Sequence, residues 1–456
     1  MAALNHAYSY SAPSQLSDDG RPQLQLATSS AAGLHPHFFE GQLTSPRLSA
    51  ELLSAVHLIV GSRFFVPANT LARLLALADP VVTAGGGVLR FEGFSGCCSA
   101  YIRVDMLPGA YDGDVVAKGT TNVDFNAPMR AALARVRDAD GLALSVGRDA
   151  LRLRSGESDM VEKKVALPLR WIRGMLEVQS YQASMRKRID AGGIEALRFF
   201  RTLPKASTSK TPLWVLAGPG GLRTTARPDA NGVRVADTSR LRVLELLLPK
   251  AKSLTVYADD AQQASAWVLD FGHMRLSLVL SAETWRGFSG EGQALRALMS
   301  AGNDGAVASV RAQLQWQASL DAQELARTLS LEKTQVEDAL RVLGVSGLAG
   351  FDVTQGQYFH RVLPFDLSLI EDMHPRMALA RVLLAEGAVS VERAAPFKAS
   401  VRSGGVLHRV REVEGELACT CPWFGKYQGA RGPCKHVLAA EALRSELPSG
   451  RPKGTT

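Results

Sequence analysis

The sequence is poor in cysteine, with five in 456 residues. An odd number of cysteines cannot all pair with one another, and three of the five fall in one short C-terminal stretch. This distribution argues against a disulfide framework and favours metal ligation in a reducing compartment.

The sequence also lacks long apolar runs. No segment approaches about 18 uninterrupted apolar residues, and residues 1–20 show no basic start followed by an apolar stretch. We therefore expect neither membrane insertion nor export, and we expect a cytoplasmic location.

Motifs for nucleotide binding and catalysis are missing as well. The glycine-rich stretch 218–221 contains neither GxxxxGK[ST] nor GxGxxG. Cys97 and Cys98 lie in an apolar, strand-like run and are expected to be inert core residues rather than a nucleophile or a redox pair. No convincing set of acid, base and nucleophile occurs in residues 40–300, which favours a role without catalysis. An enzyme with its active site in that region is the alternative.

The charge of the chain is concentrated near its C-terminal end. The formal net charge is +8, and residues 376–456 hold 13 Lys or Arg against 7 Asp or Glu, an excess of 13 − 7 = +6. A basic module attracts polyanions such as nucleic acids. Solubility is the plainer explanation for an excess of this size.

Composition indicates an ordinary globular chain of about three domains, with 46% hydrophobic and 21% charged residues. Local patterns favour a multidomain α+β fold. The expected parts are a loosely ordered arm at 1–40, a mixed α and β domain at 41–205, a strand-rich domain at 206–300, a winged-helix-like domain at 305–370 and a C-terminal domain at 375–456. The boundary near residue 205 rests on the Pro, Ser, Thr and Lys composition of residues 204–212.

Two local predictions concern the larger N-terminal part. Residues 177–190 are expected to form a helix that ends in Arg186-Lys187-Arg188, and residues 241–248 are expected to form a strand.

The winged-helix prediction rests on three helical patterns followed by a hairpin. Asp321 and Glu324 form a capping-box pattern, and Ser330 is expected to cap the following helix, residues 331–343. That helix has two basic and three acidic residues, 2 − 3 = −1, which disfavours entry into a DNA groove. Protein packing is its expected use, and a DNA-binding regulator acting through this segment is a further alternative.

The last 60 residues predict a strand, a Gly-Gly turn, a second strand, a knuckle and a helix at 435–446. Two cysteines, two positions apart, follow the strands, and a cysteine and a histidine frame the start of the helix. Three thiolates and one imidazole make a closed tetrahedral set, typical of structural zinc without an open position for catalysis. The expected ligands are Cys419, Cys421, Cys434 and His436.

The segment CTCPWFGKYQGARGPCKH, with the helix VLAAEAL after it, resembles the SWIM zinc finger, whose pattern is CxCx(n)CxH. The resemblance implies a β-hairpin plus helix, the same four ligands to Zn²⁺, and binding of DNA or protein. The whole chain also resembles bacterial proteins that carry this finger, some of which operate alongside AAA-plus ATPase and von Willebrand A-type partners.

The loop between the two halves of the ligand set combines aromatic and basic residues without any acidic one. Such a loop suits stacking on unpaired bases with phosphate contacts, or a hot spot for a protein partner. The alternative is that Trp423 and Phe424 only cover the metal site. The favoured function is a zinc-binding adaptor or scaffold that binds protein or nucleic acid, with partner-binding residues Trp423, Lys426, Tyr427 and Arg431.

Overall fold

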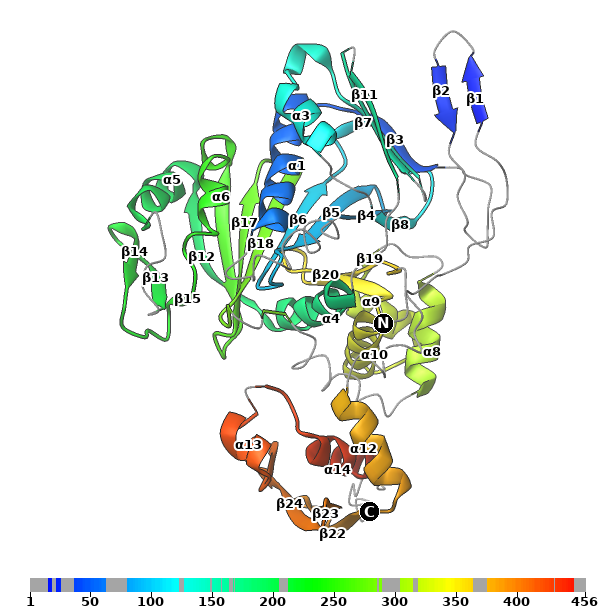
Figure 1. Cartoon of the computed structure of the whole chain (residues 1–456), viewed down its shortest axis with the longest axis vertical. Coiled ribbons are helices and arrows are strands. Elements are labelled where there is room, and N and C mark those ends of the chain that lie inside the picture. The colour runs from blue at the N-terminus through cyan, green and yellow to red at the C-terminus, as the bar shows by residue number, and fades with distance from the viewer. Residues whose placement is uncertain are drawn as a thin grey trace.

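The computed structural model combines helices with several antiparallel sheets, which confirms the mixed α and β class (Figure 1). It describes residues 15–18, 22–25, 37–62, 80–122, 127–147, 150–156, 158–163, 167, 169–204, 212–284, 287–288, 304–314, 319–363, 375–429 and 431–446. In the arm expected at 1–40, the described residues form the hairpin of β1 (Gln15–Asp18) and β2 (Pro22–Gln25) and the start of a third strand. The rest of that arm lies outside the described residues.

An eight-stranded antiparallel sheet forms the centre of the molecule. In spatial order its strands are β12 (Arg186–Gly192), β16 (Ser253–Ala258), β17 (Ala264–Asp270), β18 (Met274–Ser281), β6 (Ala100–Met106), β5 (Val88–Phe94), β4 (Val81–Gly85) and β8 (Gly119–Asn122). The helices α1 (Pro46–Gly61) and α4 (Leu169–Ser184) and the strand β20 (Ala349–Asp352) pack around its middle. Because both faces are covered there, β5 and β6 are buried along their whole length.

This sheet takes strands from both sides of residue 205. β12 pairs with β16, and β6 pairs with β18. The regions 41–205 and 206–300 therefore share one sheet and one hydrophobic core, and the linker-like composition near residue 205 does not separate two cores.

Two smaller sheets and several helices complete the larger part of the chain. The five-stranded sheet has the order β11 (Ser158–Lys163), β10 (Ala150–Ser155), β9 (Ala143–Gly147), β3 (His37–Leu43) and β7 (Tyr111–Asp114). The three-stranded sheet has the order β14 (Gly221–Thr225), β13 (Leu213–Gly218) and β15 (Val233–Val235). The other helices in the described residues of this part are α3 (Ala127–Arg135), η1 (Asp138–Asp140), α5 (Gly193–Thr202), α6 (Arg242–Glu245) and η2 (Leu248–Lys250). None of the described helices of the protein is both long and apolar enough to cross a membrane.

Two predicted elements are wrong. Residues 177–190 do not form one helix, because α4 ends at Ser184 and the next residues pair with β16 as β12. Residues 241–248 do not form a strand but helical turns. The buried leucines explain this difference, because they recur at the three- to four-residue spacing of one helical face: Leu241, Leu244, Leu247 and Leu248.

The described residues of the region 305–370 form three helices and a three-stranded sheet. Its elements are α8 (Asp304–Gln313), β19 (Ser319–Leu320), α9 (Ala322–Leu329), α10 (Lys333–Val345), β20 and β21 (Gln357–His360), with the strand order β19-β21-β20. Asp321 caps α9 by accepting from the backbone N–H groups of Gln323 and Glu324, which is the N-cap half of the predicted capping box. Ser330 does not cap α10: it ends α9 in a left-handed conformation, and Glu332 is the cap. The winged-helix assignment of this region stays a prediction.

Buried ion pairs attach this region to the central sheet. Arg103 of β6 pairs with Asp352 of β20 at 3.2 Å and donates to the carbonyl oxygen of Phe351 at 2.7 Å. Arg361 pairs with Glu92 of β5 at 2.6 Å. Residues 248 and 269 positions apart are thereby held together without access to water.

The C-terminal region forms a separate lobe, drawn in orange and red in Figure 1, with a hydrophobic cluster of its own. Its elements are α12 (Pro375–Ala385), β22 (Val389–Arg393), β23 (Lys398–Ser403), β24 (Val406–Val413), β25 (Glu416–Cys419), α13 (Pro422–Tyr427) and α14 (Lys435–Glu446). The four strands form an antiparallel meander. One of its faces packs against α14 through Ala399, Val401 and Val410.

Candidate metal centre

Four candidate ligands lie where three elements of the C-terminal lobe meet. β25 ends at Cys419, Cys421 caps the start of α13, Cys434 directly precedes α14 and His436 lies in the first turn of α14. The sequence predicted this placement of the histidine and the third cysteine. Their ligand atoms all lie within 4.8 Å of one another, and the four residues are buried.

The spacing of these atoms fits a tetrahedral metal. The Sγ atoms of Cys419 and Cys434 lie 3.8 and 3.9 Å from Nδ1 of His436. With Zn–S bonds of about 2.3 Å and Zn–N bonds of about 2.0 Å, neighbouring tetrahedral ligand atoms lie roughly 3.5 to 3.8 Å apart. The cluster therefore fits a bound metal ion with small adjustments.

Backbone amides point at the three sulfurs. Sγ of Cys419 accepts from the N–H of Cys421 at 3.4 Å, Sγ of Cys421 accepts from Phe424 at 3.3 Å, and Sγ of Cys434 accepts from Val437 at 3.5 Å. A hydrogen bond from the Cys419 thiol lowers the pKa of Cys434 to about 4, and the same contact raises the pKa of Cys419. Such donors stabilise the thiolate form that metals bind.

His436 is oriented by stacking. Its ring lies 4.3 Å from that of His408 on β24, with 33° between the planes. Nδ1 faces the thiols, whereas Nε2 is buried and has no hydrogen-bond partner among the residues that the structure describes. The sequence analysis missed His408, because only the folded hairpin brings it to the ligand.

The loop expected to bind a partner forms the short helix α13, and its aromatic rings contact cations of the same lobe. Arg376 lies 4.7 Å from the ring centre of Trp423 and donates to the carbonyl oxygens of residues 431 and 433. Arg431 lies 4.0 Å from the ring centre of Tyr427, and Lys426 lies 5.3 Å from it. The partner-binding role of this loop stays a prediction. Arg376 was missed, because nothing in the sequence connects it with a loop some 50 positions later.

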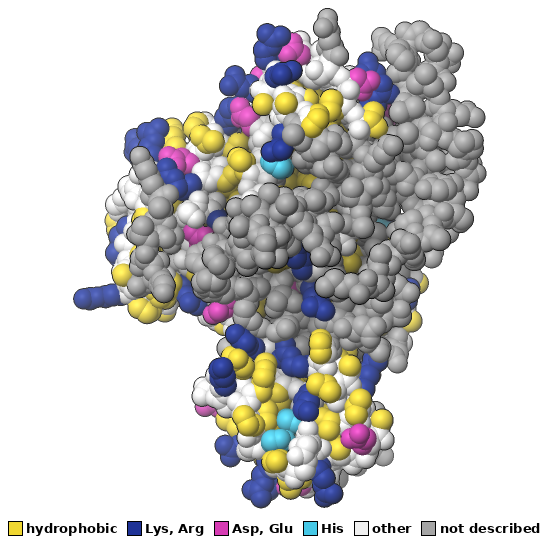
Figure 2. Space-filling model, in the orientation of Figure 1, with side chains coloured by type: hydrophobic (Ala, Val, Ile, Leu, Met, Phe, Trp, Pro, Cys, Tyr) yellow, Lys and Arg dark blue, Asp and Glu magenta, His cyan; other side chains and the backbone are white. Residues whose placement is uncertain are grey.

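The face of the four-stranded sheet that points away from α14 is basic. Directly paired residues share a face, and Arg402 pairs with Leu407, Ser400 with Arg409, and Lys398 with Arg411. The three arginines are exposed, and Lys398 is half-buried and paired with Glu392 at 2.7 Å. Among the described residues, no carboxylate lies within ion-pair distance of these arginines. Figure 2 shows many Lys and Arg side chains and few acidic ones on the C-terminal lobe.

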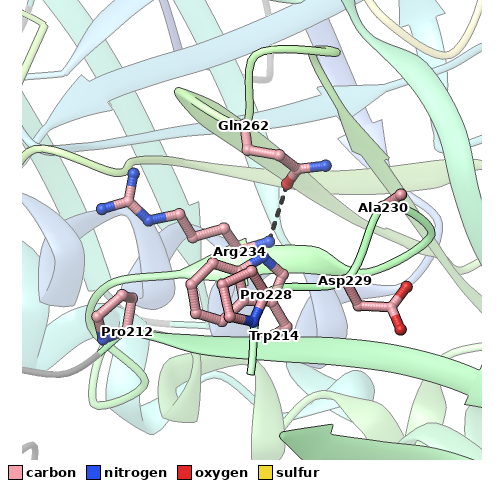
Figure 3. Close-up of a pocket in the computed structure, with 7 residues that line it drawn as sticks. All are labelled: Pro212, Trp214, Pro228, Asp229, Ala230, Arg234 and Gln262. Carbon is pink, nitrogen blue, oxygen red and sulfur yellow. Dashed lines mark hydrogen bonds between the residues drawn. The ribbon is translucent and has the colours of Figure 1, made fainter. Parts of the chain in front are cut away.

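A pocket of about 420 Å³ in the larger part offers no comparable chemistry (Figure 3). In it, Oε1 of Gln262 accepts from the backbone N–H of Arg234 at 3.0 Å, beside Trp214 and Asp229. Its lining residues are Pro212, Trp214, Pro228, Asp229, Ala230, Arg234 and Gln262. The carboxylate among them, Asp229, accepts from the backbone N–H of Asn231 at 2.8 Å, and no acid–base partner for it lines the pocket, so the pocket gives no support to the alternative of an enzyme.

Comparison with known proteins bears on the C-terminal lobe. The family model of the SWIM zinc finger matches residues 409–444. No curated protein matches the chain. One similar solved structure is the Proliferating Cellular Nuclear Antigen from Entamoeba histolytica, with 10% identity, a TM-score of 0.36, and 54% of this chain and 98% of that chain covered. The SWIM match includes all four clustered residues, and residues 409–444 of this chain are therefore a SWIM zinc finger.

Proposed function

We propose that the C-terminal lobe is a zinc-stabilised recognition module that binds nucleic acid, and that the protein acts as an adaptor or scaffold. Cys419, Cys421, Cys434 and His436 would hold one Zn²⁺. Three sulfurs and one nitrogen fill a tetrahedral shell, which leaves no position for a reacting water. The metal then stabilises the fold, and recognition falls to the protein surface around it.

The observation that carries the choice of nucleic acid is the basic outer face of the sheet. Arg402, Arg409 and Arg411 project from neighbouring positions on β23 and β24, and the apolar face behind them is already covered by α14. A flat row of guanidinium groups suits the phosphates of a nucleic acid backbone, which they contact through fork-shaped donors. This surface favours backbone contacts over base-specific ones.

A protein partner is the second candidate, and a groove of about 550 Å³ beside the sheet supports it. The exposed apolar side chains Leu379, Val382 and Leu407 line it, together with Arg402 and Lys435. Such a groove could hold an apolar segment with acidic flanks.

The DNA-binding alternative through the region 305–370 has less support. The side of α10 that carries Val336, Leu340 and Leu343 is buried, and the helix packs against α4. This arrangement agrees with the use of that helix in protein packing.

The test is binding of the full-length, zinc-loaded protein to mixed single- and double-stranded nucleic acids at several salt concentrations. The variant Arg402→Gln/Arg409→Gln/Arg411→Gln should lose most of the affinity for nucleic acid. The slope of the logarithm of the binding constant against the logarithm of the salt concentration should become shallower by about 2 to 3, because each phosphate contact contributes roughly 0.7 to 0.9 to that slope. Zinc content should stay at one equivalent.

The matched control changes the other basic surface of the lobe. The control variant Trp423→Ala/Lys426→Ala/Arg431→Ala removes three of the predicted partner-binding side chains in and after α13 and leaves the basic face of the sheet intact. If this control loses binding while the sheet variant retains it, recognition belongs to the loop. If the wild-type protein does not bind nucleic acid even at low salt, the proposal of a nucleic-acid partner is wrong.

A further inference from the structure

The turn between β5 and β6, with the sequence SGCCS at residues 95–99, forms a polar cluster far from the zinc finger in sequence. Cys98 is 6% exposed and belongs to the core, as predicted. Cys97 is half-buried, and its surroundings are polar. Of the two cysteines that the sequence places in the core, Cys98 alone is a core residue.

Arg240, which is 6% exposed, brings a positive charge to Cys97. Its Nη2 donates to Sγ of Cys97 at 2.9 Å, and its Nη1 donates to the hydroxyl oxygens of Ser95 and Ser99 at 2.9 and 2.7 Å. Asp237 is the carboxylate paired with this guanidinium, at 3.4 Å.

The two serines add further donors to the same sulfur. Their oxygens lie 3.6 Å (Ser95) and 3.3 Å (Ser99) from Sγ of Cys97. Because both oxygens already accept from Arg240, their own hydroxyl protons are available to the sulfur. Three donors thus converge on Cys97, an arrangement that suits a thiolate, since a neutral thiol is a weak acceptor.

The neighbouring cysteine has the opposite environment. The thiol of Cys98 donates to the carbonyl oxygen of Arg170 at 3.9 Å, and burial raises its pKa to about 12. Its backbone is held in the left-handed region, with φ of 56°, by hydrogen bonds with Ser95 and Phe288. A strained residue fixed in this way keeps the turn rigid and Cys97 directed at Arg240.

We propose that Cys97 is a reactive thiolate, held in that form by Arg240 and the two serines, and that it is a site of oxidation by hydrogen peroxide. The sulfur attacks one peroxide oxygen, so that an S–O bond forms and the O–O bond breaks. The leaving hydroxide takes a proton from solvent and becomes water. The sulfur loses two electrons, which the peroxide gains, and the product is a sulfenic acid.

The experiment uses the full-length, zinc-loaded protein at pH 7. Iodoacetamide measures thiol reactivity, and hydrogen peroxide with dimedone traps sulfenic acid, with each site read by peptide fragmentation. Cys97 should react with both reagents at least about tenfold faster than Cys98. The variant Arg240→Met should lower the reaction rate of Cys97 by about tenfold, and Arg240→Lys should retain most of the wild-type rate.

A second variant keeps the test valid if Arg240→Met does not fold. Asp237→Asn removes the carboxylate that shares the charge of Arg240, so it should speed Cys97 and leave Cys98 unchanged. General loosening of the turn would speed both thiols. Equal rates at Cys97 and Cys98 in the wild type, an unchanged rate in folded Arg240→Met, or equal acceleration of both thiols in Asp237→Asn would overturn the proposal.

Discussion

At the scale of single residues, the metal centre depends on the four clustered side chains Cys419, Cys421, Cys434 and His436. Cys434 directly precedes α14, and its Sγ is close to both Cys419 and His436. It is 2% exposed, so its loss leaves the remaining ligand atoms without a fourth partner inside the core of the lobe.

We predict that Cys434→Ala lowers the zinc content from about one equivalent to nearly none, because three ligands hold structural zinc far more weakly than four. Metal analysis of the purified protein measures this. Cys97→Ser removes a thiol outside the cluster and should retain full zinc. A wild-type protein with well under one equivalent would contradict the assignment of the site.

His360 should make the larger part of the protein sensitive to acid. Burial, with a smaller effect of Lys118, lowers its pKa from 6.5 to about 4. Between these values the unfolded chain binds a proton that the folded chain does not, so the unfolding free energy should fall as the pH drops from about 6.5 to about 4, by up to about 1 kcal/mol per pH unit.

Thermal unfolding of wild type and His360→Gln across this pH range isolates the effect, because all other titrating groups are shared. The variant should lose less stability on acidification. Parallel curves for the two proteins would show that His360 does not contribute.

Local chemistry was predictable where the ligands are near in sequence, and not elsewhere. The positions of Cys434 and His436 around the start of α14 follow from the chain itself, since residues two apart do not share a helical face. The surroundings of Cys97 could not be predicted from the local sequence, because Arg240 lies 143 positions later. Only the pairing of distant strands brings the two together.

At the scale of elements, prediction succeeded for turns with strong local signals. Gly404-Gly405 separates two strands as predicted, and α14 has the bounds that the sequence predicted for it. The prediction of a helix over residues 177–190 failed at β12, whose basic sequence is typical of a helix end. There the hydrogen bonds offered by β16 outweigh local propensity.

The contact of β20 with the central sheet depends on buried charges. Burial alone would raise the pKa of Asp352, but Arg103 and Arg275 outweigh it and hold the carboxyl well below its usual range. Asp352→Asn leaves these buried guanidinium groups short of negative charge, and we predict a loss of about 3 to 5 kcal/mol in unfolding free energy.

Chemical denaturation of the larger part measures this loss. Asp338→Asn is the matched control, since Asp338 forms an exposed ion pair with Arg341 on α10 and should cost under about 1 kcal/mol. Similar losses in both variants would mean that the buried network does not hold β20 in place.

At the scale of the whole molecule, the hydrophobic residues of the described chain divide into two clusters. One extends from the five-stranded sheet through the central sheet to the region 305–370. The other is confined to the C-terminal lobe and includes three of the metal ligands among its members. The sharing of one core across residue 205 was not predictable from sequence, because it arises from the pairing of strands that are far apart in the chain.

Removal of zinc should therefore unfold the C-terminal lobe and leave the larger part folded. The cluster of the lobe is small and contains the thiols themselves, and structural zinc typically supplies about 10 to 16 kcal/mol to such modules. After chelation, limited proteolysis should cut within residues 375–446, and mass spectrometry should recover a resistant fragment that ends before residue 375. Readdition of zinc should restore protection, and Cys434→Ala should be cut without chelator. Loss of the larger part at the same rate as the lobe would show that the two cores do not unfold independently.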